Sequence, residues 1–215
     1  MKHIIHWIFV AIITFGLCSS IPNSKADAVK IIRVRIGDYF YNIPTNYGSI
    51  HTGGMDTPKD AIDFRFVVLM PDFAPHTEKN DAKFKIIGWH DQIGGLFDFV
   101  PGRKVLVGKN VLAVALSDTL IDASHYSVTS NGFRVYTPRV KPDLEIHTKT
   151  LSNGDVFVMR CMQDGQKYII FPACTMLESW QGFTLTYSFS RKYAEQADVI
   201  DQKVKAMMLG FREKS

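Results

Sequence analysis

Residues 183–189 read Phe-Thr-Leu-Thr-Tyr-Ser-Phe, an alternation of large apolar and small hydroxyl side chains. Because successive side chains of a β-strand point to opposite faces, this pattern predicts a strand with one buried face and one polar face. A similar alternation occurs at residues 32–36 and 62–70, and turn signals such as Ser152-Asn153-Gly154-Asp155 separate the apolar runs. Short strands divided by regular turns favour an antiparallel sheet system.

The period of the pattern changes only at the C-terminal end. Apolar residues recur there at helical spacing: Ile200, Val204, Met207, Met208 and Phe211. We predict one amphipathic helix over residues 191–211 whose apolar stripe covers a sheet face; a membrane-surface or partner-helix role is the alternative. The predicted class is therefore α+β and mostly β, an antiparallel sheet system, sandwich-like or strongly curved, covered by one C-terminal amphipathic helix.

The N-terminal residues have the layout of a secretory signal peptide. A positive start, Met1-Lys2, precedes an apolar run at residues 7–18, and Ala26-Asp27-Ala28 is a small-x-small cleavage site. A membrane-spanning helix needs about 20 apolar residues, and this run is shorter. We therefore expect cleavage of residues 1–28, no stable membrane insertion afterwards, and a single compact β-rich domain at residues 29–215.

A lipid-anchored form is the less favoured alternative. It would need a short small-residue motif before Cys18, inside the signal, and Phe15-Gly16-Leu17 fits such a motif poorly.

Cleavage leaves two cysteines, Cys161 and Cys174. An even count in an exported chain predicts a disulfide, which would contribute about 3 kcal/mol for a loop this short. Asp164-Gly165 is a hairpin signal before a strand expected at residues 167–171. Because that hairpin carries Cys174 away from Cys161, the chain must turn back near Pro172. The alternative is a pair of buried free thiols.

Composition and motifs exclude several classes of function. The net charge of +4 is small and interspersed, which does not indicate a nucleic-acid-binding protein. The sequence contains no Gly-x-Ser-x-Gly elbow, no His-x-x-x-His pair and no phosphate-binding glycine loop. We therefore expect no catalytic residue set, no metal site and no cofactor. A carboxylate pair assembled from distant residues is the alternative that leaves an enzyme open.

The first candidate binding segment is residues 88–95, which follow a strand expected at residues 84–89. It combines aromatic, titratable and amide side chains with flexible glycines, a mixture that suits a binding loop. Its candidate residues are Trp89, His90, Asp91 and Gln92. The structural alternative is a strand end with a buried Trp89 and a glycine turn.

The second candidate segment is the turn-rich stretch of residues 43–60, with Tyr47 and His51 as candidate contact residues. Loops of this length are often either functional or disordered. We expect this loop and residues 89–95 to form one contact surface, since aromatic anchors dominate interface energy.

Several features together carry a resemblance: Gly88-Trp89 with Asp91-Gln92, Arg160-Cys161, Cys174, Tyr187-Ser188, Arg191 and Tyr193, and a helix with Lys203 and Val204 that ends at Phe211. The chain resembles a loosely defined group of small exported proteins of Gram-negative bacteria. Some of these look like immunity proteins of type VI secretion systems. The resemblance covers residues 84–95 and about 155–215, implies toxin binding in the periplasm and transfers no catalytic residues.

The functional prediction is a periplasmic protein-binding module, an inhibitor or immunity protein that neutralises a secreted toxin. The expected partner is a protein, and no nucleic acid is expected. Two alternatives stay open: an envelope-acting hydrolase with a site assembled from dispersed residues, and an envelope assembly or structural factor.

Overall fold

The computed structural model describes residues 29–51, 61–99, 110, 112–114, 121–139, 142–165 and 169–214. The predicted signal peptide with Cys18 and the far part of the 43–60 loop lie outside these residues. Within the described ranges, no helix is long and apolar enough to cross a membrane.

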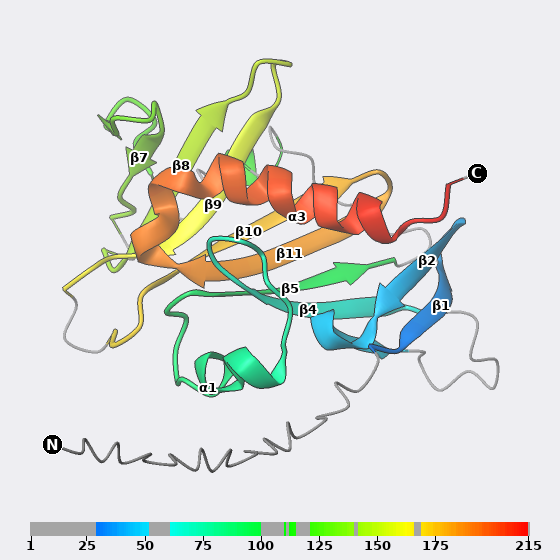
Figure 1. Ribbon diagram of the computed structural model, residues 1–215. Helices are drawn as coiled ribbons and strands as arrows, with labels where there is room; N and C mark the ends of the chain where they lie inside the picture. Colours follow the sequence, from blue (N-terminus) through cyan, green and yellow to red (C-terminus); the bar gives the residue numbers. More distant parts are fainter. Residues whose placement is uncertain are drawn as a thin grey trace, which may run out of the picture.

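The described strands form one nine-stranded antiparallel sheet and a separate two-stranded hairpin (Figure 1). In spatial order the large sheet contains β3 (Gly48–His51), β4 (Asp63–Leu69), β5 (Gln92–Asp98), β11 (Phe183–Ser190), β10 (Ala173–Trp180), β9 (Val156–Met162), β8 (Leu144–Thr150), β7 (Arg134–Tyr136) and β6 (Ser127–Val128). The hairpin contains β1 (Ile31–Ile36) and β2 (Tyr39–Pro44). The helices within the described residues include α1 (Asp81–Phe84), α3 (Ala197–Phe211) and the 3₁₀ helices Thr45–Tyr47, Glu78–Asn80 and Arg191–Gln196.

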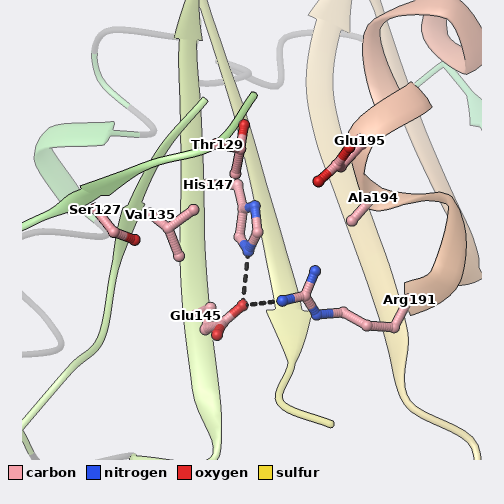
Figure 2. Close-up of a pocket in the computed structure, with 8 residues that line it drawn as sticks. All are labelled: Ser127, Thr129, Val135, Glu145, His147, Arg191, Ala194 and Glu195. Carbon is pink, nitrogen blue, oxygen red and sulfur yellow. Dashed lines mark hydrogen bonds and ion pairs between the residues drawn. The ribbon is translucent and has the colours of Figure 1, made fainter. Parts of the chain in front are cut away.

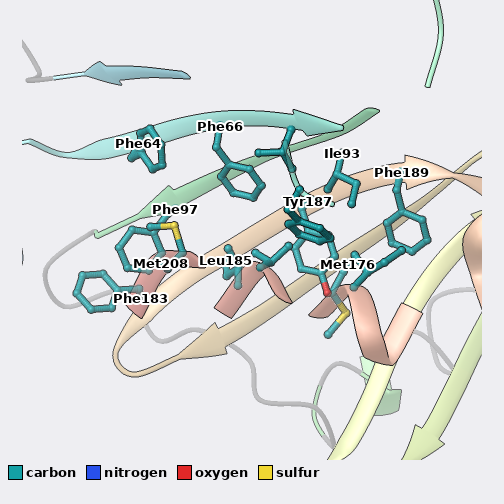
Figure 3. Packing of buried hydrophobic residues seen from close by; sticks show 14 of the residues in the cluster. Phe64, Phe66, Ile93, Phe97, Met176, Phe183, Leu185, Tyr187, Phe189 and Met208 are labelled. Atoms are coloured by element: carbon teal, nitrogen blue, oxygen red, sulfur yellow. The ribbon is translucent and has the colours of Figure 1, made fainter. Parts of the chain in front are cut away.

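The main core lies between the large sheet and α3, which crosses one sheet face (Figures 1 and 3). The apolar members of the alternating stretch are all buried on that face: Phe183, Leu185, Tyr187 and Phe189. Ile200, Val204 and Met208 of the predicted helical stripe are fully buried against them. The predicted fold class is therefore confirmed: a mostly β protein whose antiparallel sheet is covered by a C-terminal helix.

The large sheet is continuous over nine strands, but its pairing is uneven in the middle. All eight residues of β10 pair with β11, whereas only Cys174, Thr175 and Met176 pair with β9. Beyond Met176, β9 and β10 no longer pair. From there β8 and β9 diverge from β10 and β11 (Figure 1).

A disulfide joins Cys161 and Cys174, as predicted. The two residues face each other in the β9–β10 register, with their Cα atoms 4.0 Å apart. The hairpin strand expected at residues 167–171 is wrong in its described part, because residues 169–172 lie outside any strand. Pro172 cannot donate to a ladder, and pairing resumes at Ala173, opposite Ser190 of β11.

Replacing both Cys161 and Cys174 with Ser is expected to lower the free energy of unfolding of residues 29–215 by about 3 kcal/mol, because the bond closes a short loop in the unfolded chain. Urea denaturation with and without a thiol reductant measures this loss. The reductant should destabilise the parent protein and leave the double variant unchanged. An equal effect on both proteins would show that the bond contributes nothing.

The helix expected at residues 191–211 is α-helical only from Ala197 onward. Residues Arg191–Gln196 form a 3₁₀ helix, an element common at the start of α-helices. Neighbouring side chains in this segment are held by different elements, since Arg191 binds Glu145 of β8 and Tyr193 binds Asp91. These contacts with other parts of the fold stabilise the 3₁₀ conformation of the segment, which is wound more tightly than an α-helix.

The strand expected at residues 84–89 is also wrong. These residues form the end of α1 and a series of turns, and the strand, β5, starts at Gln92. The glycines of β5 have a packing reason: a Cβ atom on Gly95 would lie 2.3 Å from Cζ of Phe66. The buried phenylalanine ring therefore occupies the space that a side chain would need, and a glycine in a strand marks such a close approach.

Candidate functional site

An apolar surface patch lies where the loop before β5 meets the loop before β10. We call it the apolar patch; it consists of Ile86, Ile87, Ile170 and Phe171, all exposed. Ile87 is 80% and Ile170 79% exposed, although both are large and branched. Single exposed apolar residues are ordinary, but a cluster on adjacent loops is typical of an interaction site.

Close packing joins the two loops into one surface. Gly88 has φ +98°, and a Cβ atom on it would lie 2.5 Å from Cγ of Phe171. The rings of His90 and Phe171 lie with their centroids 5.4 Å apart. His90 Nε2 also donates a hydrogen bond of 3.0 Å to the carbonyl oxygen of Ile87. The patch therefore depends on Gly88, because any side chain there would displace Phe171.

A hollow of about 250 Å³ opens beside the patch. Its lining residues are Trp89, His90, Ile170, Phe171, Pro172, Ser190 and Lys192. Trp89 is half-buried and lies over Gly94 of β5, where an added Cβ atom would be 3.4 Å from the indole ring. The missing side chain of Gly94 lets the indole lie against the sheet and serve as a wall of the hollow.

Asp91 and Gln92 anchor the loop. Lys192 Nζ and Tyr193 OH each donate a 2.6 Å hydrogen bond to Asp91 Oδ1. The bond from Lys192, followed by that from Tyr193, lowers the pKa of Asp91. Gln92 donates from Nε2 to the carbonyl oxygens of Lys83 and Phe84. Of the four candidates in this segment, Trp89 and His90 line the hollow, while Asp91 and Gln92 hold the loop in place.

Tyr47 and His51 are not among the residues that line the Trp89 hollow. The Tyr47 ring packs 4.9 Å from the Phe211 ring and is half-buried. His51 is exposed, with Nδ1 3.3 Å from Asp63 Oδ2, and the β3–β4–β5 register places it at the Asp98 end of β5. Trp89 precedes the other end of β5, and its ring lies over Gly94, four residues or roughly 13 Å from Asp98 along the strand.

A second hollow of about 220 Å³ lies between β8 and the 3₁₀ helix (Figure 2). Its lining residues are Ser127, Thr129, Val135, Glu145, His147, Arg191, Ala194 and Glu195. The Glu145 carboxylate accepts a 2.8 Å hydrogen bond from Nε2 of the buried His147 and another from Arg191. The bond from His147 is the largest influence on the pKa of Glu145 and lowers it, with help from Arg191 and against the effect of burial.

Two hydroxyl groups, those of Ser127 and Thr129, also line the second hollow. A hydroxyl nucleophile must hydrogen-bond to its histidine base, yet within the described ranges neither Ser127 nor Thr129 does so with His147. Thr129 Oγ1 instead accepts from the backbone of Phe133. In the part of the chain that the structure describes, no group of three or more His, Cys, Asp or Glu side chains could hold a metal ion. Glu145, His147 and Arg191 tie the 3₁₀ helix to β8.

Comparisons with known proteins find similar folds but no similar sequence. No protein-family model matches the chain, and no curated protein matches it in sequence. Smlt3025, an immunity protein of the Stenotrophomonas maltophilia type IV secretion system, aligns with a TM-score of 0.60 and 10% identity, over 86% of this chain and 94% of that chain. The Neisseria meningitidis iron-regulated outer membrane lipoprotein FrpD aligns with a TM-score of 0.53 and 13% identity, over 84% and 92%.

At these identities the likeness shows the fold alone. One neighbour is an immunity protein, as the sequence resemblance implied, but its secretion system is type IV. The comparisons give the type VI label no support.

Proposed function

We propose that this protein is an exported protein-binding module that neutralises a secreted toxin in the periplasm, as an immunity protein does. The observation that carries the proposal is the apolar patch beside the Trp89 hollow, because such a surface gains most from contact with another protein. The immunity-protein neighbour supports the same reading through its fold. The disulfide supports an oxidising compartment, in which such bonds persist.

A partner search followed by reconstitution tests this function. Immobilised residues 29–215 are incubated with envelope and secreted fractions of the producing bacterium, and retained proteins are identified by mass spectrometry. The identified partner is then purified and mixed with the module. We expect a defined complex in which the partner's toxic activity is lost. A partner that stays fully toxic in the complex, or retention of no protein, would refute the proposal.

Export through the predicted signal peptide has its own test. Intact-mass measurement of the exported protein should give a chain that starts close to Val29. The lipoprotein neighbour makes the lipid-anchored form the alternative to exclude. A mass that includes residues 7–17, or a lipid on Cys18, would replace the free periplasmic form with a membrane-anchored one.

A further inference from the structure

We propose that the hollow beside Trp89 is the anchoring pocket of the interface, and that it receives one large apolar side chain of the protein partner, flanked by a carboxylate. This inference rests on the proposed function, since it names the chemistry of the partner at the same surface. It also adds Phe171, Pro172 and Lys192 to the candidate contact residues.

The size and lining of the hollow favour a single side chain. Its volume of about 250 Å³ is below the roughly 300–1,000 Å³ of small-molecule sites. The rings of Trp89, Phe171 and Pro172 supply apolar walls. Interface energy concentrates where such an anchor enters a preformed pocket surrounded by contacts that exclude water. Ile170 of the lining and Ile87 of the adjoining apolar patch, both exposed, can supply those contacts.

The charges around the hollow favour an acidic partner. Lys192 lines the hollow, and Lys83 and Lys85 lie in the segment that leads into Ile86 of the patch. The two carboxylates of the same segments are already bound, Asp81 by Lys85 and Asp91 by Lys192. The charge of Lys83 is then in excess in these segments. It would attract an acidic group of the partner, because complementary charges speed and orient association.

The concave shape favours a protein over a lipid surface. Exposed apolar side chains such as Ile87 and Ile170 can also insert into a bilayer, but the hollow walled by the half-buried Trp89 is a concave site that a single protein side chain can fill. We therefore treat bilayer binding as an outcome that would overturn the proposal.

Peptide selection supplies a probe that does not depend on knowing the partner. A random linear peptide library displayed on phage is selected on folded residues 29–215. We expect the recovered peptides to share a large apolar residue next to Asp or Glu. Recovery of basic peptides, of sequences without a shared apolar position, or of no binder would overturn the proposal.

Matched variants locate the binding site. Ile87→Asp and Ile170→Asp should each weaken binding of a selected peptide at least about tenfold, because each puts a charge at the rim of the anchor. Ile31→Asp on β1 is the control, since Ile31 is also an exposed isoleucine, at 61%. Lys83→Glu should weaken the same peptide, and Lys30→Glu, another exposed lysine on the N-terminal segment, should not.

The outcomes separate failure of this inference from failure of the proposed function. A natural partner that binds all five variants equally well would place the interface elsewhere and leave the immunity-type function standing. Binding of anionic phospholipid vesicles that Ile87→Asp and Ile170→Asp abolish would assign the patch to a membrane and overturn the anchoring pocket. Loss of toxin neutralisation together with peptide binding, in Ile87→Asp and Ile170→Asp but not in Ile31→Asp, would support both.

Discussion

Replacing Ile200 with Asp is expected to lower the melting temperature of residues 29–215 strongly and to reduce the yield of soluble protein. Ile200 is fully buried in the contact between α3 and the sheet. The change removes about 1.5–3 kcal/mol of apolar burial and also places an unpaired carboxylate in the core. The combined loss should exceed about 4 kcal/mol, against a typical domain stability of about 5–15 kcal/mol. Circular dichroism on heating and the yield of soluble protein measure the effect.

The preceding residue of the same helix provides the control. Val199 is 49% exposed, so Val199→Asp introduces the same charge with little loss of burial, and we expect a melting temperature close to that of the parent. If Ile200→Asp instead melts like the parent and loses binding to a partner or to lipid, the apolar stripe of α3 is an interface and does not cover the core.

The features that the sequence predicts well are those with a local period. The alternation at residues 183–189 assigns each side chain to a face without knowledge of the neighbouring strand, and the spacing of Ile200, Val204 and Met208 does the same for α3. Cys161 and Cys174 were correctly paired because no other cysteine remains after the predicted cleavage. Each of these inferences needs only side-chain types and their intervals.

The features that the sequence does not predict depend on contacts between distant segments. Gly94 and Gly95 discourage a strand locally, yet β5 forms because the Trp89 and Phe66 rings fill the space above them. The apolar run that ends at Phe171 has the composition of a strand, and nothing local distinguishes an exposed run from a buried one. The apolar patch and the Glu145–His147–Arg191 cluster were missed for this reason.

A buried polar network between α3 and the sheet gives the second large expected effect. Tyr187 OH donates a 2.9 Å hydrogen bond to Asp201 Oδ1, and Lys205 Nζ lies 2.7 Å from Asp201 Oδ2 and 2.8 Å from Glu178 Oε1. One ammonium group therefore serves two carboxyl groups. Burial, with the nearby Asp201 charge, raises the pKa of Glu178 to about 8, so this side chain keeps a proton at neutral pH.

Replacing Lys205 with Met is expected to lower the free energy of unfolding by about 3 kcal/mol or more, because Asp201 loses its buried counter-ion. The loss should grow with pH. Folded Glu178 holds a proton that the unfolded chain releases above its ordinary pKa, so its contribution is fully present at low pH and declines as the pH rises through about 8. Without Lys205, ionisation of Glu178 in the folded protein costs still more free energy.

Urea denaturation at about pH 6 and about pH 9, on either side of the Glu178 pKa, measures the stability loss caused by Lys205→Met and its growth with pH. Glu178→Gln mimics the protonated acid, so it should flatten this pH dependence and gain stability relative to the parent at the higher pH. The double variant with Lys205→Met should recover part of the loss, because only Asp201 then stays charged. An equal penalty for Lys205→Met at both pH values, with no recovery in the double variant, would mean that the lysine acts through its packing and not as the shared counter-ion.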